Sequence, residues 1–65
     1  MKTIIHYEGN VYETPSYDAS VEDTAKALYA DLDRIDKMQF KLKGGGYLLL
    51  SGEAVKRCAF MVLDS

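Results

Sequence analysis

Cys58 and His6 are the thiol and the imidazole of this sequence, so they are the residues that could form a nucleophilic pair. In such a pair the imidazole accepts the thiol proton and the thiolate attacks the substrate. Cys58, however, lies in an apolar segment, where a buried and unreactive thiol is the usual outcome. We therefore interpret Cys58 as a core residue and His6 as a polar cross-strand neighbour of Glu13. The sequence indicates no catalytic residue.

Two further patterns suggest anion or metal binding, and neither is complete. A phosphate-binding loop requires a lysine, a hydroxyl residue and a helix after its glycines, whereas Tyr47 and three leucines follow the glycines at 44–46. We interpret these glycines as a hairpin loop. Asp31, Asp33 and Asp36 do not share one helix face, and one cysteine with one histidine cannot supply a zinc site. We therefore expect no metal ion and no other cofactor.

The formal net charge of −2 conceals an uneven distribution. Residues 8–36 carry eight carboxylates and two cations, a net charge of −6, whereas residues 37–57 carry five cations and one carboxylate, a net charge of +4. A dipolar distribution favours a protein partner, or a second copy of the chain, over a membrane or a bare phosphate backbone. The simpler interpretation is that these charges only solubilise a helix face and a sheet edge.

Nucleic-acid binding is the alternative function. A basic sheet surface with a stacking aromatic residue could bind a single strand, and its candidate residues are Lys41, Lys43, Tyr47, Lys56 and Arg57. A sequence pI near 5.1 and the absence of RNP-like, helix-turn-helix or zinc motifs oppose it. The acidic region could conversely imitate a phosphate backbone and occupy a nucleic-acid groove of a partner.

The elements that must position these residues begin with a hairpin over residues 2–15. Gly9-Asn10 suits a two-residue turn, because glycine accepts a positive φ without steric cost. Pro15 ends the second strand. The turn predicts two opposed groups of side chains: Ile5, Tyr7 and Tyr12 on one face, and Ile4, His6, Val11 and Glu13 on the other. Since neither face is polar, we expect one face to meet the helix and the other to meet a second protomer.

Residues 21–38 predict the main helix. Ser20 followed by Asp23 is a capping-box variant, and apolar residues recur at steps of three and four through Val21, Ala25, Leu28, Leu32, Ile35 and Met38. The acidic outer side of this helix is the predicted partner-binding surface, with candidate residues Glu22, Asp23, Lys26, Tyr29, Asp33 and Asp36.

Three more strands are expected after the helix, over residues 39–43, 47–50 and 54–63, with a turn at 51–53. An irregular segment around residues 54–56 is the alternative start of the last strand. Residues 59–63 are apolar on both faces, which is typical of a central strand covered on both sides. The predicted fold is α+β: a small antiparallel sheet of order ββαβββ, with one amphipathic helix packed across one face. Self-association is assigned to Ile4, His6, Val11, Phe60 and Val62.

With 65 residues and 48% hydrophobic residues, residues 1–65 are expected to form one small domain with one marginal core. The first residues do not resemble a signal peptide, and no apolar run approaches the roughly 20 residues that span a bilayer. We therefore expect a cytoplasmic protein without membrane contact. Its core would be supplemented by a homodimer.

An N-terminal hairpin, an acidic helix and then the run Gly-Gly-Gly-Tyr-Leu-Leu-Leu-Ser-Gly-Glu-Ala-Val-Lys-Arg complete the layout. In this layout the chain resembles small uncharacterised accessory proteins encoded by phages and mobile elements of Gram-positive bacteria. The resemblance implies a cytoplasmic, non-enzymatic protein that binds and inhibits or assists a host or phage protein. It assigns a role to no particular residue.

Overall fold

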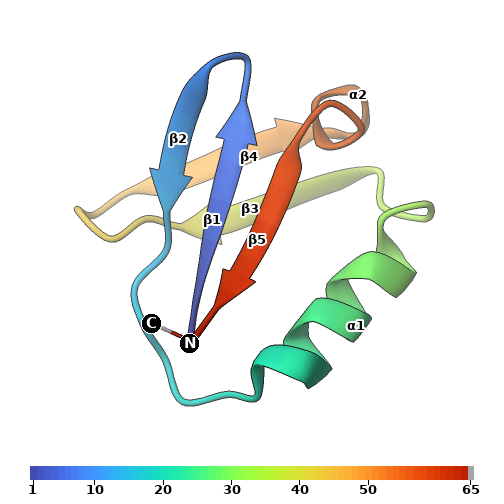
Figure 1. Ribbon diagram of the computed structural model, residues 1–65. Helices are drawn as coiled ribbons and strands as arrows, with labels where there is room; N and C mark the ends of the chain where they lie inside the picture. Colours follow the sequence, from blue (N-terminus) through green and yellow to red (C-terminus); the bar gives the residue numbers. More distant parts are fainter. Residues whose placement is uncertain (65) are drawn as a thin grey trace.

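The computed structural model describes residues 1–64, which form an α+β arrangement of two small antiparallel sheets with one main helix (Figure 1). Sheet A has the strand order β2-β1-β5, and sheet B pairs β3 with β4. The elements are β1 (Lys2–Tyr7), β2 (Asn10–Glu13), α1 (Val21–Asp31), β3 (Lys37–Lys41), β4 (Tyr47–Ser51), α2 (Gly52–Val55) and β5 (Ala59–Leu63). The predicted class and the order of strands around the helix are confirmed, but the strands are divided between two sheets. The predicted packing of the helix across one face of the sheet is wrong, because sheet B covers the inner face of sheet A and α1 contacts its edge strand β5.

The first hairpin turns at Glu8 and Gly9, one residue earlier than predicted. Both residues have a positive φ, 48° and 81°, as a two-residue hairpin turn of the mirror-image type requires. His6 consequently lies opposite Val11, and the predicted pairing of His6 with Glu13 is wrong. Moving the turn by one residue changes each cross-strand partner by two. The predicted division of side chains between the two faces therefore holds.

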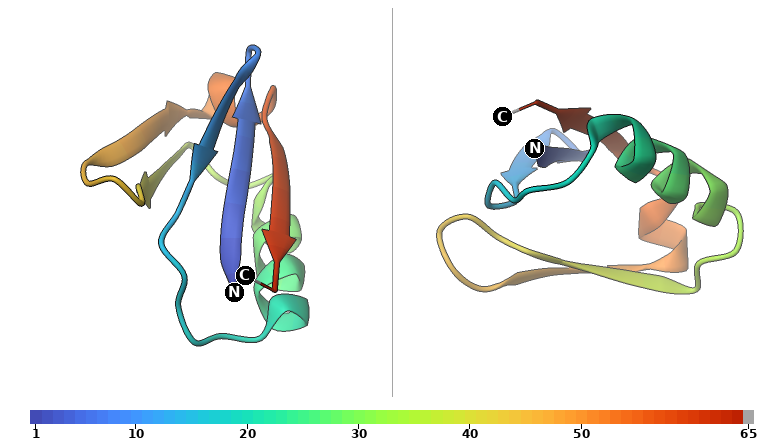
Figure 2. Two further views of the ribbon diagram at one scale, coloured as in Figure 1. Left: turned by 60° about the vertical axis from the view of Figure 1, so that its left-hand side comes forward. Right: turned by 90° about the horizontal axis from the view of Figure 1, so that it is seen from below.

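The core lies between the two sheets, which form two layers with α1 beside β5 (Figure 2). Leu50, Ala54 and Val55 are buried at its centre, and partly buried side chains from both sheets pack against them. Phe40 of sheet B and Phe60 of sheet A meet there with ring centroids 5.8 Å apart. This tilted aromatic contact joins the layers.

The main helix is shorter than predicted, because α1 ends at Asp31 and not at residue 38. Ser20 Oγ accepts a hydrogen bond from Asp23 N at 3.2 Å, as the capping pattern predicts. The far end carries carboxylates and no basic residue in its last turn, which is unfavourable beside the negative end of the helix dipole. Met38 instead enters β3, where it lies opposite Leu50. Burial of Met38 against β4 thus takes precedence over helical spacing.

The last strand also differs from the prediction, because α2 occupies residues 52–55 and β5 begins at Ala59. Ser51 Oγ caps α2 by accepting a hydrogen bond from Ala54 N at 3.2 Å. β5 is an edge strand of sheet A, and the central strand is β1. Within residues 1–64, no helix has the length and hydrophobicity needed to cross a membrane.

Gly52 is expected to be essential for packing α2 against the segment before β3. A Cβ at Gly52 would lie 2.9 Å from the backbone O of Asp36, so Gly52→Ala must displace one of the two segments. We expect Gly52→Ala to lower the free energy of unfolding by about 1–3 kcal/mol. Gly44→Ala is the matched control, because no described atom outside Gly44 and its two chain neighbours lies within 4 Å of its Cβ position. Urea unfolding measures both; equal effects would contradict the close approach.

Candidate interaction surfaces

The outer face of sheet A is the side that points away from sheet B. Cross-strand pairing of Ile4 with Met61 places these side chains on the outer face, whereas the adjacent pair, Ile5 and Phe60, points into the core. Val11, Met61 and Leu63 are 61%, 42% and 40% exposed. The residues that define this outer face are Lys2, Ile4, His6, Val11, Glu13, Ala59, Met61 and Leu63.

The outer face brings together only part of the predicted self-association set. Ile4, His6 and Val11 share it, as predicted, but Phe60 and Val62 lie on the opposite side of β5. The reason is the pairing of β5 with β1, which aligns Phe60 with Ile5. Met61 and Leu63 lie on the outer face in place of Phe60 and Val62. Side chains alternate along residues 59–63, and this alternation is the sequence signal that separates Met61 and Leu63 from Phe60 and Val62.

Glu13 makes the polar contacts at the border of the outer face. Its Oε2 accepts hydrogen bonds from Lys2 Nζ and Lys43 Nζ, each at 3.3 Å. Its backbone O accepts a hydrogen bond from Lys43 N at 2.9 Å, which ties β2 to the turn after β3. The ammonium group of Lys2, followed by that of Lys43, holds the pKa of Glu13 below its ordinary value of 4.5.

Cys58 and His6 do not form a nucleophilic pair in this fold. His6 is exposed on the outer face, whereas Cys58 packs against the core cluster on the other side of sheet A. Cys58 Sγ donates a hydrogen bond to the backbone O of Ala54 at 3.2 Å. Burial raises the pKa of the Cys58 thiol, so the thiolate needed for attack is disfavoured.

The predicted partner-binding residues divide between α1 and the segment after it. Glu22, Asp23, Lys26 and Tyr29 are exposed on α1, and Lys26 Nζ lies 3.0 Å from Glu22 Oε1. Tyr29 is 81% exposed. The remaining two members of the set, Asp33 and Asp36, are exposed in the connection to β3, because the helix ends before them.

A shallow apolar groove separates α1 from β5. None of the residues in Val21–Asp31 is buried, and the helix contributes half-buried side chains to one wall of the groove. The lining residues are Ala25, Lys26, Leu28, Tyr29, Leu32, Cys58, Ala59, Phe60 and Val62. Phe60 and Val62 therefore belong to this groove and not to the outer face.

The predicted basic surface is also divided. Lys41 lies directly opposite Tyr47 in sheet B, and both side chains are exposed. Lys43 is held by Glu13, as described above. Arg57 lies at the other end of sheet A, where its Nη1 is 3.7 Å from Glu8 Oε1 and its guanidinium lies over the Tyr7 ring.

The last member of that basic set, Lys56, is exposed at the end of α2. It lines a separate hollow with Glu53 and the residues of the 33–36 connection. The five candidate residues thus do not form one continuous surface.

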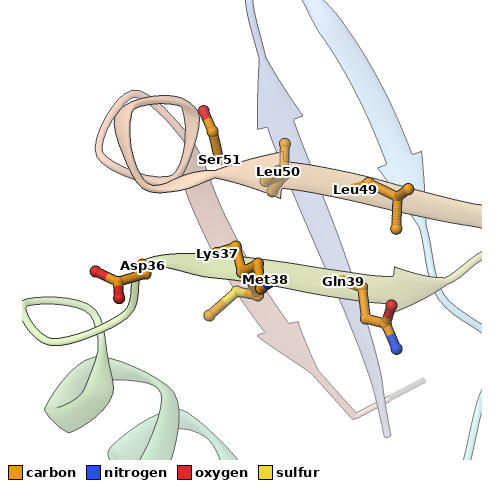
Figure 3. Close-up of a pocket in the computed structure, with 7 residues that line it drawn as sticks. All are labelled: Asp36, Lys37, Met38, Gln39, Leu49, Leu50 and Ser51. Atoms are coloured by element: carbon orange, nitrogen blue, oxygen red, sulfur yellow. The ribbon is translucent and has the colours of Figure 1, made fainter.

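A pocket lies at the end of sheet B where β3 begins, and its lining includes both solvent-facing and core-facing side chains (Figure 3). Leu49 stands beside Gln39 across the two strands and is 70% exposed. The pocket is lined by Asp36, Lys37, Met38, Gln39, Leu49, Leu50 and Ser51. Sequence reasoning did not assign Lys37, Gln39 or Leu49 to a site, although alternation through residues 47–50 pairs Leu49 with Tyr47 on one side.

No grouping of three or more His, Cys, Asp and Glu residues that could hold a metal ion occurs in the part of the chain that the structure describes. Comparisons of the chain with protein-family models, curated proteins and solved structures found no match. The functional assignment therefore depends on the surfaces described above.

Replacing Glu13 by glutamine is expected to lower the thermal unfolding midpoint at neutral pH and to have little effect in acid. The pKa of Glu13 is lower in the folded chain than in the unfolded chain, so its stabilising effect is complete above about pH 4.5. It is lost as the pH falls through the folded-state pKa.

Circular dichroism during heating, at neutral pH and well below pH 4.5, measures this difference. Asp18→Asn is the control, because Asp18 is exposed and forms no ion pair within residues 1–64. An equal destabilisation by Glu13→Gln at both pH values would show that its ion pairs contribute nothing. Added salt should reduce the neutral-pH difference, since Glu13 is accessible to solvent.

Proposed function

We propose that this chain is a non-enzymatic protein-binding module that self-associates through the outer face of sheet A. The observation that best supports this proposal is the composition of the face, on which Val11, Met61 and Leu63 are exposed around Ile4. Within residues 1–64, sheet B and both helices lie elsewhere, and no element covers it (Figure 2). A sheet face with this composition is typical of an interface.

A second copy of the chain is the proposed occupant of the outer face. Two such faces can stack about 10 Å apart, as sheets do in a β-sandwich, and bury their apolar side chains against each other. In a two-fold dimer both copies contribute the same residues to the interface, so the buried core contains each residue of the face twice. The core within one copy is modest, since six hydrophobic residues of the described chain are buried, one of them, Ile4, lies on the outer face, and none belongs to α1. A second core would add the stability that one layer of packing lacks.

The border of the outer face is compatible with this stacking. The Lys2 and Glu13 side chains neutralise each other at 3.3 Å, so pairing two copies does not bury an isolated charge there. His6 is a third ionisable group on this face, and its side chain is exposed. A dimer through this face would place His6 between Val11 and Ala59 within the interface.

Binding of a different protein is assigned to the exposed surface of α1, which includes Tyr29 at the border of the groove between α1 and β5. Tyr29 combines a large ring with a polar hydroxyl and is the most exposed of the large hydrophobic residues, a combination common in binding hot spots. Asp23 carries a negative charge without an ion-pair partner among the described residues, which favours a basic partner surface. This arrangement is consistent with an accessory or inhibitor protein of a phage or mobile element, which the layout of the chain resembles.

Self-association is expected to give a dimer mass at micromolar concentration and to be lost in Met61→Lys. The substitution places an unpaired ammonium group in the interface twice, so the dissociation constant of the dimer should rise by about 100-fold or more. Size-exclusion chromatography with light scattering measures the mass of each variant.

Leu49→Lys is the matched control for this substitution. Leu49 is exposed like Met61 but lies on sheet B, so Leu49→Lys should remain dimeric. A strictly monomeric wild-type chain would reject self-association. Equal disruption by both substitutions would reject the outer face as the interface. Circular dichroism checks that each variant is folded.

The partner surface on α1 is expected to act independently of the dimer. In pull-downs from a bacterial host, a protein that binds wild-type chain and Met61→Lys should be lost when Tyr29→Ala and Asp23→Lys are combined. A partner retained by that double variant would place the binding surface elsewhere on the chain. Mass spectrometry of the recovered proteins compares the three baits.

A further inference from the structure

The outward side of sheet B has a regular composition that the proposed dimer does not use. Along both strands exposed and covered side chains alternate, so one side faces the core and the other faces solvent. We call the solvent-facing side the sheet B platform. Its residues are Lys37, Gln39 and Lys41 from β3, and Tyr47, Leu49 and Ser51 from β4.

The platform presents an aromatic ring and a cation side by side. Tyr47 is 61% exposed and lies directly across from Lys41, at a separation typical of about 5 Å between facing Cβ atoms. The next pair along the ladder is Leu49 with Gln39, which adds an exposed apolar surface and an amide. Figure 3 shows Leu49 and Gln39 projecting from adjacent strands. An aromatic ring for stacking, a neighbouring ammonium group and an amide are the groups used to bind an unpaired nucleotide.

The cations of the platform differ from most others in the chain. Of the eight lysines and arginines, five form ion pairs: Lys2, Lys26, Arg34, Lys43 and Arg57. The other three, Lys37, Lys41 and Lys56, form no ion pair within residues 1–64. Two of these three lie on the platform, so a local positive potential persists in a chain of negative net charge.

The two lysines of the platform are not equivalent. Asp36 is exposed beside Lys37 and lines the same pocket, so its carboxylate reduces the positive potential at this end. Lys41 has no carboxylate opposite it, since its cross-strand neighbour is Tyr47. The end of the platform that contains Lys41 and Tyr47 is therefore the stronger anion site.

We propose that the sheet B platform binds single-stranded nucleic acid, with a base stacked on Tyr47 and phosphates beside Lys41 and Lys37. A single strand is favoured over a duplex, because Tyr47 needs an unstacked base and the platform offers no helix that could enter a groove. Each strand has five residues and spans about 17 Å, which limits the site to a few nucleotides. We therefore expect weak binding with little sequence preference.

The first experiment compares two exposed tyrosines. Fluorescence anisotropy of a labelled oligothymidylate of about ten nucleotides measures binding at about 50 mM salt, with protein up to about 100 µM. Tyr47→Ala should weaken binding by about 5- to 150-fold, the usual loss for one stacked base. Tyr29→Ala is the matched control, because Tyr29 is 81% exposed on the acidic helix and should not contribute.

The second experiment uses the salt dependence of binding between about 50 and about 200 mM. Two lysine contacts to a single strand predict a slope of about −1.4 for the logarithm of the binding constant against the logarithm of salt concentration. Lys41→Gln should reduce this slope to about −0.7 and weaken binding more than Lys37→Gln does. Lys26→Gln is the control, since Lys26 is paired with Glu22 on α1.

Three results would overturn the proposal. These are no detectable binding at about 50 mM salt, an equal loss in Tyr29→Ala and Tyr47→Ala, or equal binding of polyglutamate that is insensitive to Tyr47→Ala. The last result would indicate a general site for acidic polypeptides. Met61→Lys should bind the oligonucleotide through the same residues. A failure of the proposed self-association can therefore be distinguished from a failure of the proposed nucleic-acid binding. Circular dichroism confirms that each variant is folded.

Discussion

Packing of the two sheets against each other is the interaction on which the other elements of this structure depend. Phe40 and Phe60 meet at 5.8 Å between the layers, and Leu50, Ala54 and Val55 fill the space beside them. These side chains come from β3, β4, α2 and β5, so the core joins segments that are distant in sequence. Since each strand alternates its side chains, burying one side of a sheet necessarily turns the other side outward. One shared core between two sheets thus leaves two outward faces, and α1 lies beside β5 without closing either of them.

The two outward faces differ in chemistry because the solvent-facing positions of their strands hold different types of residue. In sheet A the alternating positions hold Ile4, Val11, Met61 and Leu63 together with Lys2, His6 and Glu13, so the outer face combines an apolar patch with polar side chains. In sheet B they hold lysine, glutamine, tyrosine and leucine, so the platform is cationic and partly aromatic. Apolar surface gains most from excluding water, whereas unpaired cations gain most from a counter-charge. This difference supports the proposed dimer on one side of the molecule and the proposed nucleic-acid site on the other.

Features that depend on neighbouring residues could be predicted from the sequence, and features that depend on distant pairing could not. Ser20 signals the start of α1, and alternation separates Phe40 from Lys41, because both signals are local. The end of α1 could not be predicted from the sequence, because Ile35 and Met38 satisfy helical spacing, while Met38 and Phe40 equally satisfy strand spacing. Only the pairing of Met38 with Leu50 decides between them.

The same distinction applies to the candidate sites. Ile4, His6 and Val11 lie within one hairpin, so the alternation of side chains along its two strands is enough to place them on one face. Assigning Met61 rather than Phe60 to that face requires the alignment of Ile5 with Phe60, across a loop closure of more than fifty residues. In the proposed dimer the two outward faces would act together, because stacking two copies through sheet A would direct the two sheet B platforms away from each other. A weak site present twice in one particle gains affinity when one strand reaches both, so the apolar face would strengthen binding at a surface that it does not touch.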